Sequence, residues 1–348
     1  MTIKEQAAVM KLNSTKMAVT TLEERNRALE GIREALLAHK EEIFKANKED
    51  MERAGEEGIA APILKRLKFQ EEKLQEVTTG ILDLIGLPDP LGKEQMRREL
   101  DTDLLLIRES CPIGVIGVIF EARPDAMVQI ASLCIKSGNC AILKGGSEAM
   151  KTNKKIFEII YQAATAAGMP ENCMFQIEAR SDITELLECH ESVDLLIPRG
   201  SNEFVQYIMN HTKIAVMGHA DGICHIYADK TLDLDKAIPV ILDSKTQYTA
   251  VCNATETLLV HKDIAGELLP RLNEALRAKN VEVRGTKEVR QIVECEPATE
   301  EDFSTEYLDL IISVKIVEDI QEAVDHINKY GSHHTDCILT EDPKAARL

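Results

Sequence analysis

The stretch Tyr248–His261, YTAVCNATETLLVH, places a thiol where a loop meets a strand. ETLLVH is rich in β-branched and aliphatic residues that favour a strand, and Asn253, directly after Cys252, favours a turn. A thiolate is a strong nucleophile, and a free thiol with a pKa of about 8.5 is ionised to a small extent at neutral pH. The nine cysteines lie at irregular spacings, and a cysteine more often fills a core than reacts. Spacing alone therefore does not single out Cys252.

Two other stretches combine glycine with groups that suit an anion, and each follows an expected strand. In AILKGGSEA, Lys144 ends the strand, Gly145 lets the backbone approach a ligand, and Ser147 precedes a helix. In LLIPRGSNEF, Gly200 and Ser201 lie at the start of a helix whose free N–H groups suit a pyrophosphate. Neither stretch has the G-x-G-x-x-G pattern, and a serine at this place is often only a helix cap.

The segment GHADGICHIY brings His219, Asp221, Cys224 and His225 close together in the sequence. These residue types bind metals, but adjacent Cys224 and His225 would point to opposite faces of a strand. No second pair completes a tetrahedral set, so we expect no metal here.

Composition excludes several classes of partner. The chain has 348 residues, 44% of them hydrophobic, and a formal net charge of −18, which repels nucleic acid and anionic lipid. The cysteines show no disulfide or zinc spacing, and neither a signal peptide nor an apolar run of membrane-spanning length is present. We expect a cytoplasmic protein with reduced thiols and no nucleic-acid or membrane partner.

Apolar periodicity predicts amphipathic helices over residues 1–80, with a capping box formed by Thr21 and Glu24. Beyond the proline-containing break at LPDPLG, apolar strands alternate with helices, which predicts an α/β fold with a parallel sheet covered on both faces. A second α/β unit is expected from Leu232. LLLIRESCPIGVIGVIF predicts a hairpin near residues 98–113 that turns at Cys111–Gly114. Open parallel sheets bind ligands at the carboxyl ends of their strands, which here carry FEARPD, KGGSEA and PRGSNE.

At these motifs the chain resembles the γ-glutamyl phosphate reductases, a branch of the aldehyde dehydrogenase superfamily. The similar blocks occur in one order: GVIGVIFEARPDA, LKGGSEA, LIPRGSN, GHADGICH and CNATETLLVH. The most specific block runs from Val317 to Ile338 and follows the family signature around Y-G-S-x-H-T-D. The resemblance implies an aldehyde dehydrogenase-like fold, with N-terminal helices and a Rossmann-type NADP-binding domain over 1–231 and an α/β catalytic domain over 232–348. It also implies that the hairpin near 98–113 serves oligomerisation.

The resemblance also implies a reaction, because Cys252 matches the catalytic cysteine of the superfamily. Its thiolate would attack L-glutamyl 5-phosphate, expel phosphate and form a thioester, which hydride from NADPH would reduce to L-glutamate 5-semialdehyde in proline biosynthesis. The backbone N–H of Cys252 would contribute to the oxyanion hole. The implied cofactor-binding residues are Lys144, Gly145, Ser147, Gly200 and Ser201.

Two departures from the wider superfamily bear on the substrate. The block that carries a glutamate base in hydrolytic members reads VMGH here, which suits a thioester exchanged with phosphate and not with water. The oxyanion-hole asparagine of those enzymes aligns with Arg123, so we expect Arg123, His219 and Asn253 to contact the substrate. Because the ligands are anions on an acidic chain, cations must line the site; the candidates are Lys144, Arg123, Arg199 and Lys245.

Two alternatives stay open: another acylating aldehyde dehydrogenase, acting on a coenzyme A thioester, or an inactive truncated protein that only binds the cofactor. Members of the family continue past EDPKAARL, so the catalytic domain is expected to be truncated at its C-terminal end. For the full-length protein we expect a homo-oligomer, to which glutamate 5-kinase could pass the acyl phosphate directly.

Overall fold

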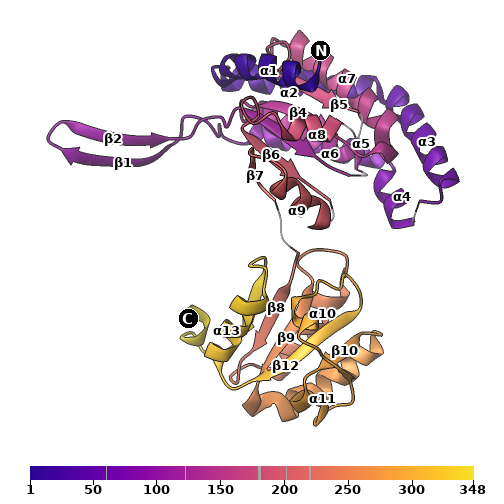
Figure 1. Cartoon of the computed structure of the whole chain (residues 1–348), viewed down its shortest axis with the longest axis vertical. Helices are drawn as coiled ribbons and strands as arrows, with labels where there is room; N and C mark the ends of the chain where they lie inside the picture. Colours follow the sequence, from indigo (N-terminus) through magenta and orange to yellow (C-terminus); the bar gives the residue numbers. More distant parts are fainter. Residues whose placement is uncertain (60, 122, 179–181, 201, 219–220) are drawn as a thin grey trace. The chain divides into compact units, whose positions relative to one another are not determined.

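The chain forms two compact units, Met1–His219 and Ala220–Leu348, in a computed structural model of the protein (Figure 1). The structure describes residues 1–348 except 60, 122, 179–181, 201 and 219–220. This boundary between the units falls earlier in the chain than the boundary expected near residue 231. The reason is that β8 (Cys224–Ala228) pairs with β9 (Thr255–His261) in the second sheet. Among the described residues, no helix is both long and apolar enough to cross a membrane.

The described part of the first unit begins with the helices α1 to α5, which confirms the helical pattern predicted over residues 1–80. Leu29, Ile32 and Leu36 share one face of α2 and are completely buried. The predicted capping box is present: the Glu24 N–H donates to the Thr21 hydroxyl (3.2 Å), and the Thr21 N–H donates to the Glu24 carboxylate (2.8 Å). The helices are α1 (Ile3–Ala18), α2 (Leu22–Ala38), α3 (Lys40–Glu56), α4 (Ala61–Leu67) and α5 (Glu71–Gly86).

A five-stranded parallel sheet forms the centre of this unit, in the order β5-β4-β3-β6-β7. Parallel crossovers are right-handed, so the reversal of direction at β3 puts α6 and α7 on one face and α8 and α9 on the other. Helices α2, α3 and α5 pack outside α6 and α7 (Figure 1). The predicted α/β fold with a doubly covered sheet is confirmed. Its elements are β3 (Val115–Ile119), α6 (Pro124–Lys136), β4 (Cys140–Lys144), α7 (Met150–Ala166), β5 (Met174–Ile177), α8 (Asp182–Leu187), β6 (Leu195–Pro198), α9 (Asn202–Asn210) and β7 (Ala215–Val216).

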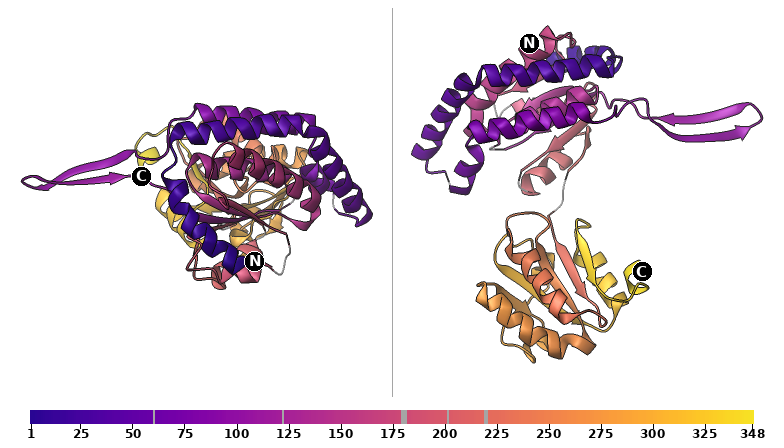
Figure 2. Two further views of the ribbon diagram at one scale, coloured as in Figure 1. Left: turned by 90° about the horizontal axis from the view of Figure 1, so that it is seen from above. Right: turned by 180° about the vertical axis from the view of Figure 1, so that it is seen from behind.

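A separate antiparallel hairpin, β1 (Glu94–Asp101) with β2 (Leu104–Glu109), extends from this unit (Figure 2). It turns at Thr102–Asp103, where Asp103 has a φ of 61°. The prediction of a turn at Cys111–Gly114 was wrong, since those residues link β2 to the parallel sheet. Every residue of both strands is exposed.

The second unit contains a parallel sheet in the order β11-β10-β12-β9-β8-β13. Helices α10 and α11 pack on one another and on β9, whereas α13 packs on β8 and β12. Because neighbouring strands are parallel, the loops that precede β8, β9 and β13 meet at one edge. Besides β8 and β9, the elements are α10 (Leu234–Thr246), α11 (Lys262–Ala278), β10 (Glu282–Gly285), α12 (Lys287–Arg290), β11 (Glu296–Pro297), β12 (Ile311–Val317), α13 (Ile320–Tyr330) and β13 (Asp336–Leu339).

Candidate active site

Cys252 lies in an exposed turn between α10 and β9 of the second unit. The following residue, Asn253, is also exposed, and the turn is closed by an N–H of Ala254 that donates to the Val251 carbonyl (3.1 Å). An exposed thiol in a turn can meet an electrophile without any rearrangement of the core. The structure thus places Cys252 and Asn253 side by side at an accessible position.

Burial distinguishes four of the other cysteines from the exposed Cys252. It raises the pKa of the Cys134, Cys140 and Cys173 thiols to about 12, and that of Cys224 to about 11. These four thiols are therefore almost entirely protonated at neutral pH and are poor nucleophiles. The exposed cysteines are Cys111, Cys252 and Cys337.

Two neighbouring loops hold the turn that carries Cys252. A Cβ atom added to Gly222 would lie 1.8 Å from the Cys252 carbonyl oxygen, so the two backbones are in direct contact. The same carbonyl accepts a hydrogen bond from the Cys224 thiol (3.2 Å), whose sulfur lies 3.9 Å from His334 Nδ1. The N–H of Ile223 donates to the Ser332 hydroxyl (3.0 Å). The loops before β8, β9 and β13 therefore form one cluster around Cys252.

Ser332 and His334 were not identified as site residues from the sequence. Both belong to the Y-G-S-x-H-T-D block, so the motif was a signal, but it carries no information about which loops it contacts. Only the pairing of β13 with β8 brings them next to the Cys252 turn.

Lys245 does not face a ligand, contrary to the expectation from charge. Its Nζ lies 2.6 Å from Glu256 Oε2, and both side chains are buried. Burial lowers the pKa of Lys245 and raises the pKa of Glu256, and each partner's charge opposes the other's shift. Lys245 is therefore neutralised by Glu256 inside the fold.

The carboxyl ends of three strands meet in the first unit, as the parallel sheet predicts. Ile119 of β3 is in register with Lys144 of β4 and with Pro198 of β6. The segments that follow these strands contain Glu121, Gly145 and Gly200 respectively. The strand order reverses at β3, because β4 and β5 lie on one side of it and β6 and β7 on the other. Open α/β sheets bind ligands at such a reversal point.

Close packing explains the glycines at this edge. A Cβ atom on Gly145 would lie 2.2 Å from Asn153 Nδ2, and one on Gly200 would lie 2.9 Å from Glu121 Oε1. Lys144 is buried, and its Nζ donates to the Gly145 carbonyl (2.6 Å). Neither position has room for a side chain, so glycine is required at both turns.

Ser147 and Arg123, two further predicted site residues, are exposed in the first unit. Ser147 opens a short 3₁₀ turn, and its carbonyl accepts a hydrogen bond from Arg53 Nη2 (2.8 Å). Arg123 is the N-cap of α6 and forms an ion pair with Asp125 (2.9 Å). The predicted residues Ser201 and His219 lie outside the described residues.

Asn153 is a residue of this edge that sequence reasoning missed. It lies on α7 and is 1% exposed, and neither its Nδ2 nor its Oδ1 has a hydrogen-bond partner among the described residues. A single asparagine within an amphipathic helix gives no sequence signal, because its position over Gly145 depends on how α7 packs.

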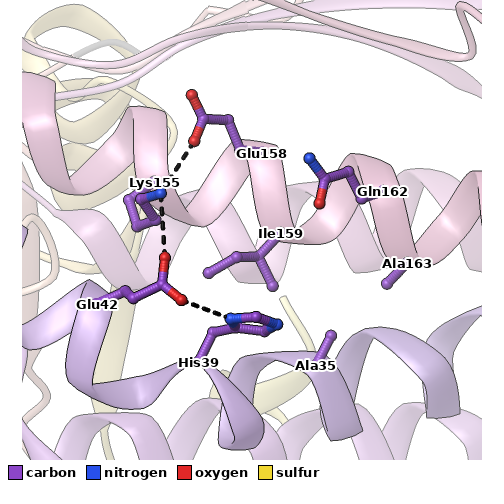
Figure 3. A pocket seen from close by; sticks show the side chains of 8 residues that line it. All are labelled: Ala35, His39, Glu42, Lys155, Glu158, Ile159, Gln162 and Ala163. Carbon is purple, nitrogen blue, oxygen red and sulfur yellow. Dashed lines mark hydrogen bonds and ion pairs between the residues drawn. The ribbon is translucent and has the colours of Figure 1, made fainter.

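A hollow of about 280 Å³ between α2, α3 and α7 is lined by none of the candidate site residues (Figure 3). Glu42 pairs with His39 (2.7 Å) and with Lys155 (3.3 Å), and Lys155 also pairs with Glu158 (3.2 Å). The lining contains neither a cysteine nor a glycine turn. We therefore assign no catalytic role to this hollow.

Two buried imidazoles lie behind the Cys252 cluster, between β8 and α13. His225 Nδ1 is 3.1 Å from Asp336 Oδ1, and the rings of His225 and His326 are 5.6 Å apart in an edge-on arrangement. Both ring nitrogens of His326 lack a hydrogen-bond partner among the described residues. Burial, with the charge of Lys315 and the neighbouring His225, lowers the pKa of His326 to about 3.

This buried imidazole should make the second unit sensitive to acid. The unfolded chain binds a proton at His326 below pH 6.5, whereas the folded chain does so only near pH 3. Stability is therefore lost as pH falls from 6.5 towards 3, by at most about 1.4 kcal/mol per pH unit from this group. Urea unfolding at about pH 7.5 and about pH 5.5 measures the loss. The variant His326→Phe should show a smaller pH dependence, and an unchanged dependence would contradict the assignment.

Comparison with known proteins identifies the family. The sequence pattern of the Aldehyde dehydrogenase family matches residues 2–292. The chain is 54% identical over 346 residues to the γ-glutamyl phosphate reductase of Acetivibrio thermocellus, which covers 99% of this chain and 80% of the relative. It is 52% identical over 349 residues to the γ-glutamyl phosphate reductase of Pelotomaculum thermopropionicum. That match covers 100% of this chain and 80% of the relative.

Solved structures give the same result. The crystal structure of the γ-glutamyl phosphate reductase of Thermotoga maritima superposes with a TM-score of 0.95 at 38% identity, covering 99% of this chain and 84% of that one. A propionaldehyde dehydrogenase of Rhodopseudomonas palustris, with a TM-score of 0.60 at 16% identity over 99% and 82% of the two chains, shares the fold. The chain therefore belongs to the γ-glutamyl phosphate reductases, within the aldehyde dehydrogenase family.

Proposed function

We propose that the protein is a cytoplasmic enzyme that reduces L-glutamyl 5-phosphate to L-glutamate 5-semialdehyde and phosphate, with NADPH, in proline biosynthesis. The observation that carries the proposal is the exposed Cys252 at the meeting point of three loops, in a chain 54% identical to a γ-glutamyl phosphate reductase. Membership of this family makes the protein an oxidoreductase.

The chemistry follows from the accessible thiol. The Cys252 thiolate attacks the acyl carbon of the substrate, a C–S bond forms, and the C–O bond to phosphate breaks with its electron pair on the departing phosphate. NADPH, when bound, would supply the hydride that reduces the resulting thioester. Collapse of the tetrahedral adduct breaks the C–S bond, releases the aldehyde and returns the thiolate to Cys252. Covalent capture replaces a labile acyl phosphate with a thioester held at a fixed position.

The glycine turns at the carboxyl edge of the first sheet fit a dinucleotide. Side chains at Gly145 or Gly200 would collide with Asn153 or Glu121, so both turns must remain bare backbone. Lys144 is the last residue of β4, directly before Gly145, where its ammonium suits a ribose hydroxyl or a phosphate. We assign Lys144, Gly145, Ser147, Gly200 and Ser201 to the cofactor, and Arg123, Asn253 and His219 to the substrate.

Lys144→Ala is expected to raise the KM for NADPH by roughly tenfold, with a smaller effect on kcat. The reason is that this lysine would contribute binding shared by the ground state and the transition state. Steady-state kinetics with varied NADPH measure both constants, and Lys151→Ala, which removes a half-exposed lysine of α7 paired with Glu49, is the control. A fall in kcat at an unchanged KM would contradict a cofactor role for Lys144.

The reverse reaction tests the function directly. With L-glutamate 5-semialdehyde and NADP⁺, formation of NADPH should require inorganic phosphate, and arsenate should replace phosphate. A reaction that requires coenzyme A in place of phosphate would support the alternative of an acyl-coenzyme A reductase. NADPH binding with neither reaction would support a protein that only binds the cofactor.

We infer that the β1–β2 hairpin mediates self-association. A two-stranded hairpin is only marginally stable alone, yet this one exposes apolar side chains on both strands. The exposed apolar residues are Met96, Leu100, Leu104, Leu105, Leu106 and Ile107. Light scattering of the double variant Leu104→Glu/Leu106→Glu should give a lower molar mass than that of the parent; an equal mass would refute the role.

A further inference from the structure

Two side-chain pairs tie together the ends of the loop that carries Cys252. At one end lies α10, with Ser244 and Lys245, and at the other lies the start of β9, with Thr255 and Glu256. The hydroxyls of Thr255 and Ser244 are 3.0 Å apart, and Lys245 Nζ is 2.6 Å from Glu256 Oε2. We call these four residues the loop clamp. The clamp spans residues 247–254, and Cys252 lies within that span.

The charged pair of the clamp is sealed inside the second unit. The side chains of Lys245 and Glu256 are 0% and 1% exposed, respectively. Glu256 Oε1 also accepts the N–H of Leu308 (3.4 Å), and Lys245 Nζ lies 5.9 Å from the centre of the Tyr307 ring. The segment before β12 therefore also packs against this pair.

Stability alone does not explain a buried pair of this kind. Removing two charges from water is costly, and apolar residues of similar volume often give equal or greater stability. What a buried pair adds is a requirement for one geometry, because any displacement leaves a charge without its partner. At this position, that geometry is the separation between the two ends of the Cys252 loop.

We propose that the loop clamp positions the nucleophile, with Lys245 and Glu256 holding the two ends of the loop at a fixed separation. This inference rests on the proposed function. Three of the four clamp residues are buried, and they act through the loop backbone, whose Cys252 carbonyl also accepts the Cys224 thiol. A displacement of the reacting sulfur by about 1 Å costs roughly a hundredfold in rate. Loss of the clamp should therefore lower kcat strongly while the free energy of unfolding changes little.

The decisive variant replaces both charges with apolar side chains of similar volume, Lys245→Met/Glu256→Leu. We expect a urea midpoint close to that of the parent, a kcat lowered by roughly ten- to a hundredfold, and an unchanged KM for NADPH. Amide hydrogen exchange in residues 247–254 should accelerate, while exchange in α11 stays the same. The control, Lys262→Met/Glu318→Leu, removes an exposed ion pair of the same unit and should change none of these quantities.

A second variant covers the case in which the double replacement fails to fold. Thr255→Val keeps the shape of the side chain and removes only the hydroxyl tie to Ser244, so it should lower kcat by a smaller factor with the same faster exchange of the loop. A kcat within twofold of the parent in the folded variants would overturn the proposal, whatever the exchange shows. If the parent itself lacks reductase activity, the proposed function fails, and loop exchange in the same variants still decides whether the clamp orders the loop.

Discussion

Cys252→Ser is expected to lower the kcat of the reductase by at least about a thousandfold and to leave NADPH binding near that of the parent. A serine hydroxyl is scarcely ionised at neutral pH and is therefore a much weaker nucleophile than a cysteine thiol. The glycine turns that we propose for the cofactor belong to the other compact unit, so the substitution does not alter their residues. Single-turnover kinetics measure the loss, and fluorescence titration with NADPH measures binding.

The matched control for this variant is Cys337→Ser. Cys337 is also an exposed, free thiol of the second unit, but it lies within β13 and not in the turn before β9. Its variant should retain full activity. Mass spectrometry after mixing the parent with acyl phosphate should find the acyl group on the peptide containing Cys252. If Cys252→Ser kept more than a tenth of the activity, another thiol would be the nucleophile.

The first unit shows how far local sequence patterns determine structure. The apolar strands, the amphipathic helices and the Thr21 capping box were all correctly predicted, because each depends on residues close together in the chain. The carboxyl-edge rule also placed Lys144 and Gly200 at the ends of β4 and β6, the two strands that flank β3. The hairpin turn was assigned wrongly because CPIG has strong turn residues, whereas the real turn, at Thr102–Asp103, has weaker ones.

The Cys252 cluster could not be derived from local patterns. Its contacts join residues far apart in sequence, such as Cys224 with Cys252 and Ile223 with Ser332, and depend on the order of strands in the sheet. The charge argument failed at Lys245 for a related reason. Composition shows that cations are needed, but it cannot show which of them is neutralised by a buried carboxylate such as Glu256.

The importance of Gly222 also could not be derived from local sequence patterns, since it depends on a single backbone contact. Its added Cβ atom would lie 1.8 Å from the Cys252 carbonyl oxygen and 2.7 Å from the Cys252 Cα. Both atoms belong to the backbone, so no side-chain rotation can relieve the collision. A methyl group at Gly222 must therefore displace either its own loop or the turn that carries Cys252.

We therefore expect Gly222→Ala to lower kcat by about a hundredfold and to destabilise the second unit by about 1–3 kcal/mol. The control, Gly266→Ala, lies in α11 of the same unit with nothing within 4 Å of its added Cβ atom. In a helix interior this replacement should stabilise the protein by up to about 1 kcal/mol and leave kcat unchanged. Steady-state kinetics and urea unfolding of both variants measure these effects. If Gly222→Ala turned over at the parent's rate, the Cys252 turn would have to be free to shift without losing its catalytic geometry, and the loop clamp could not be what positions the thiol.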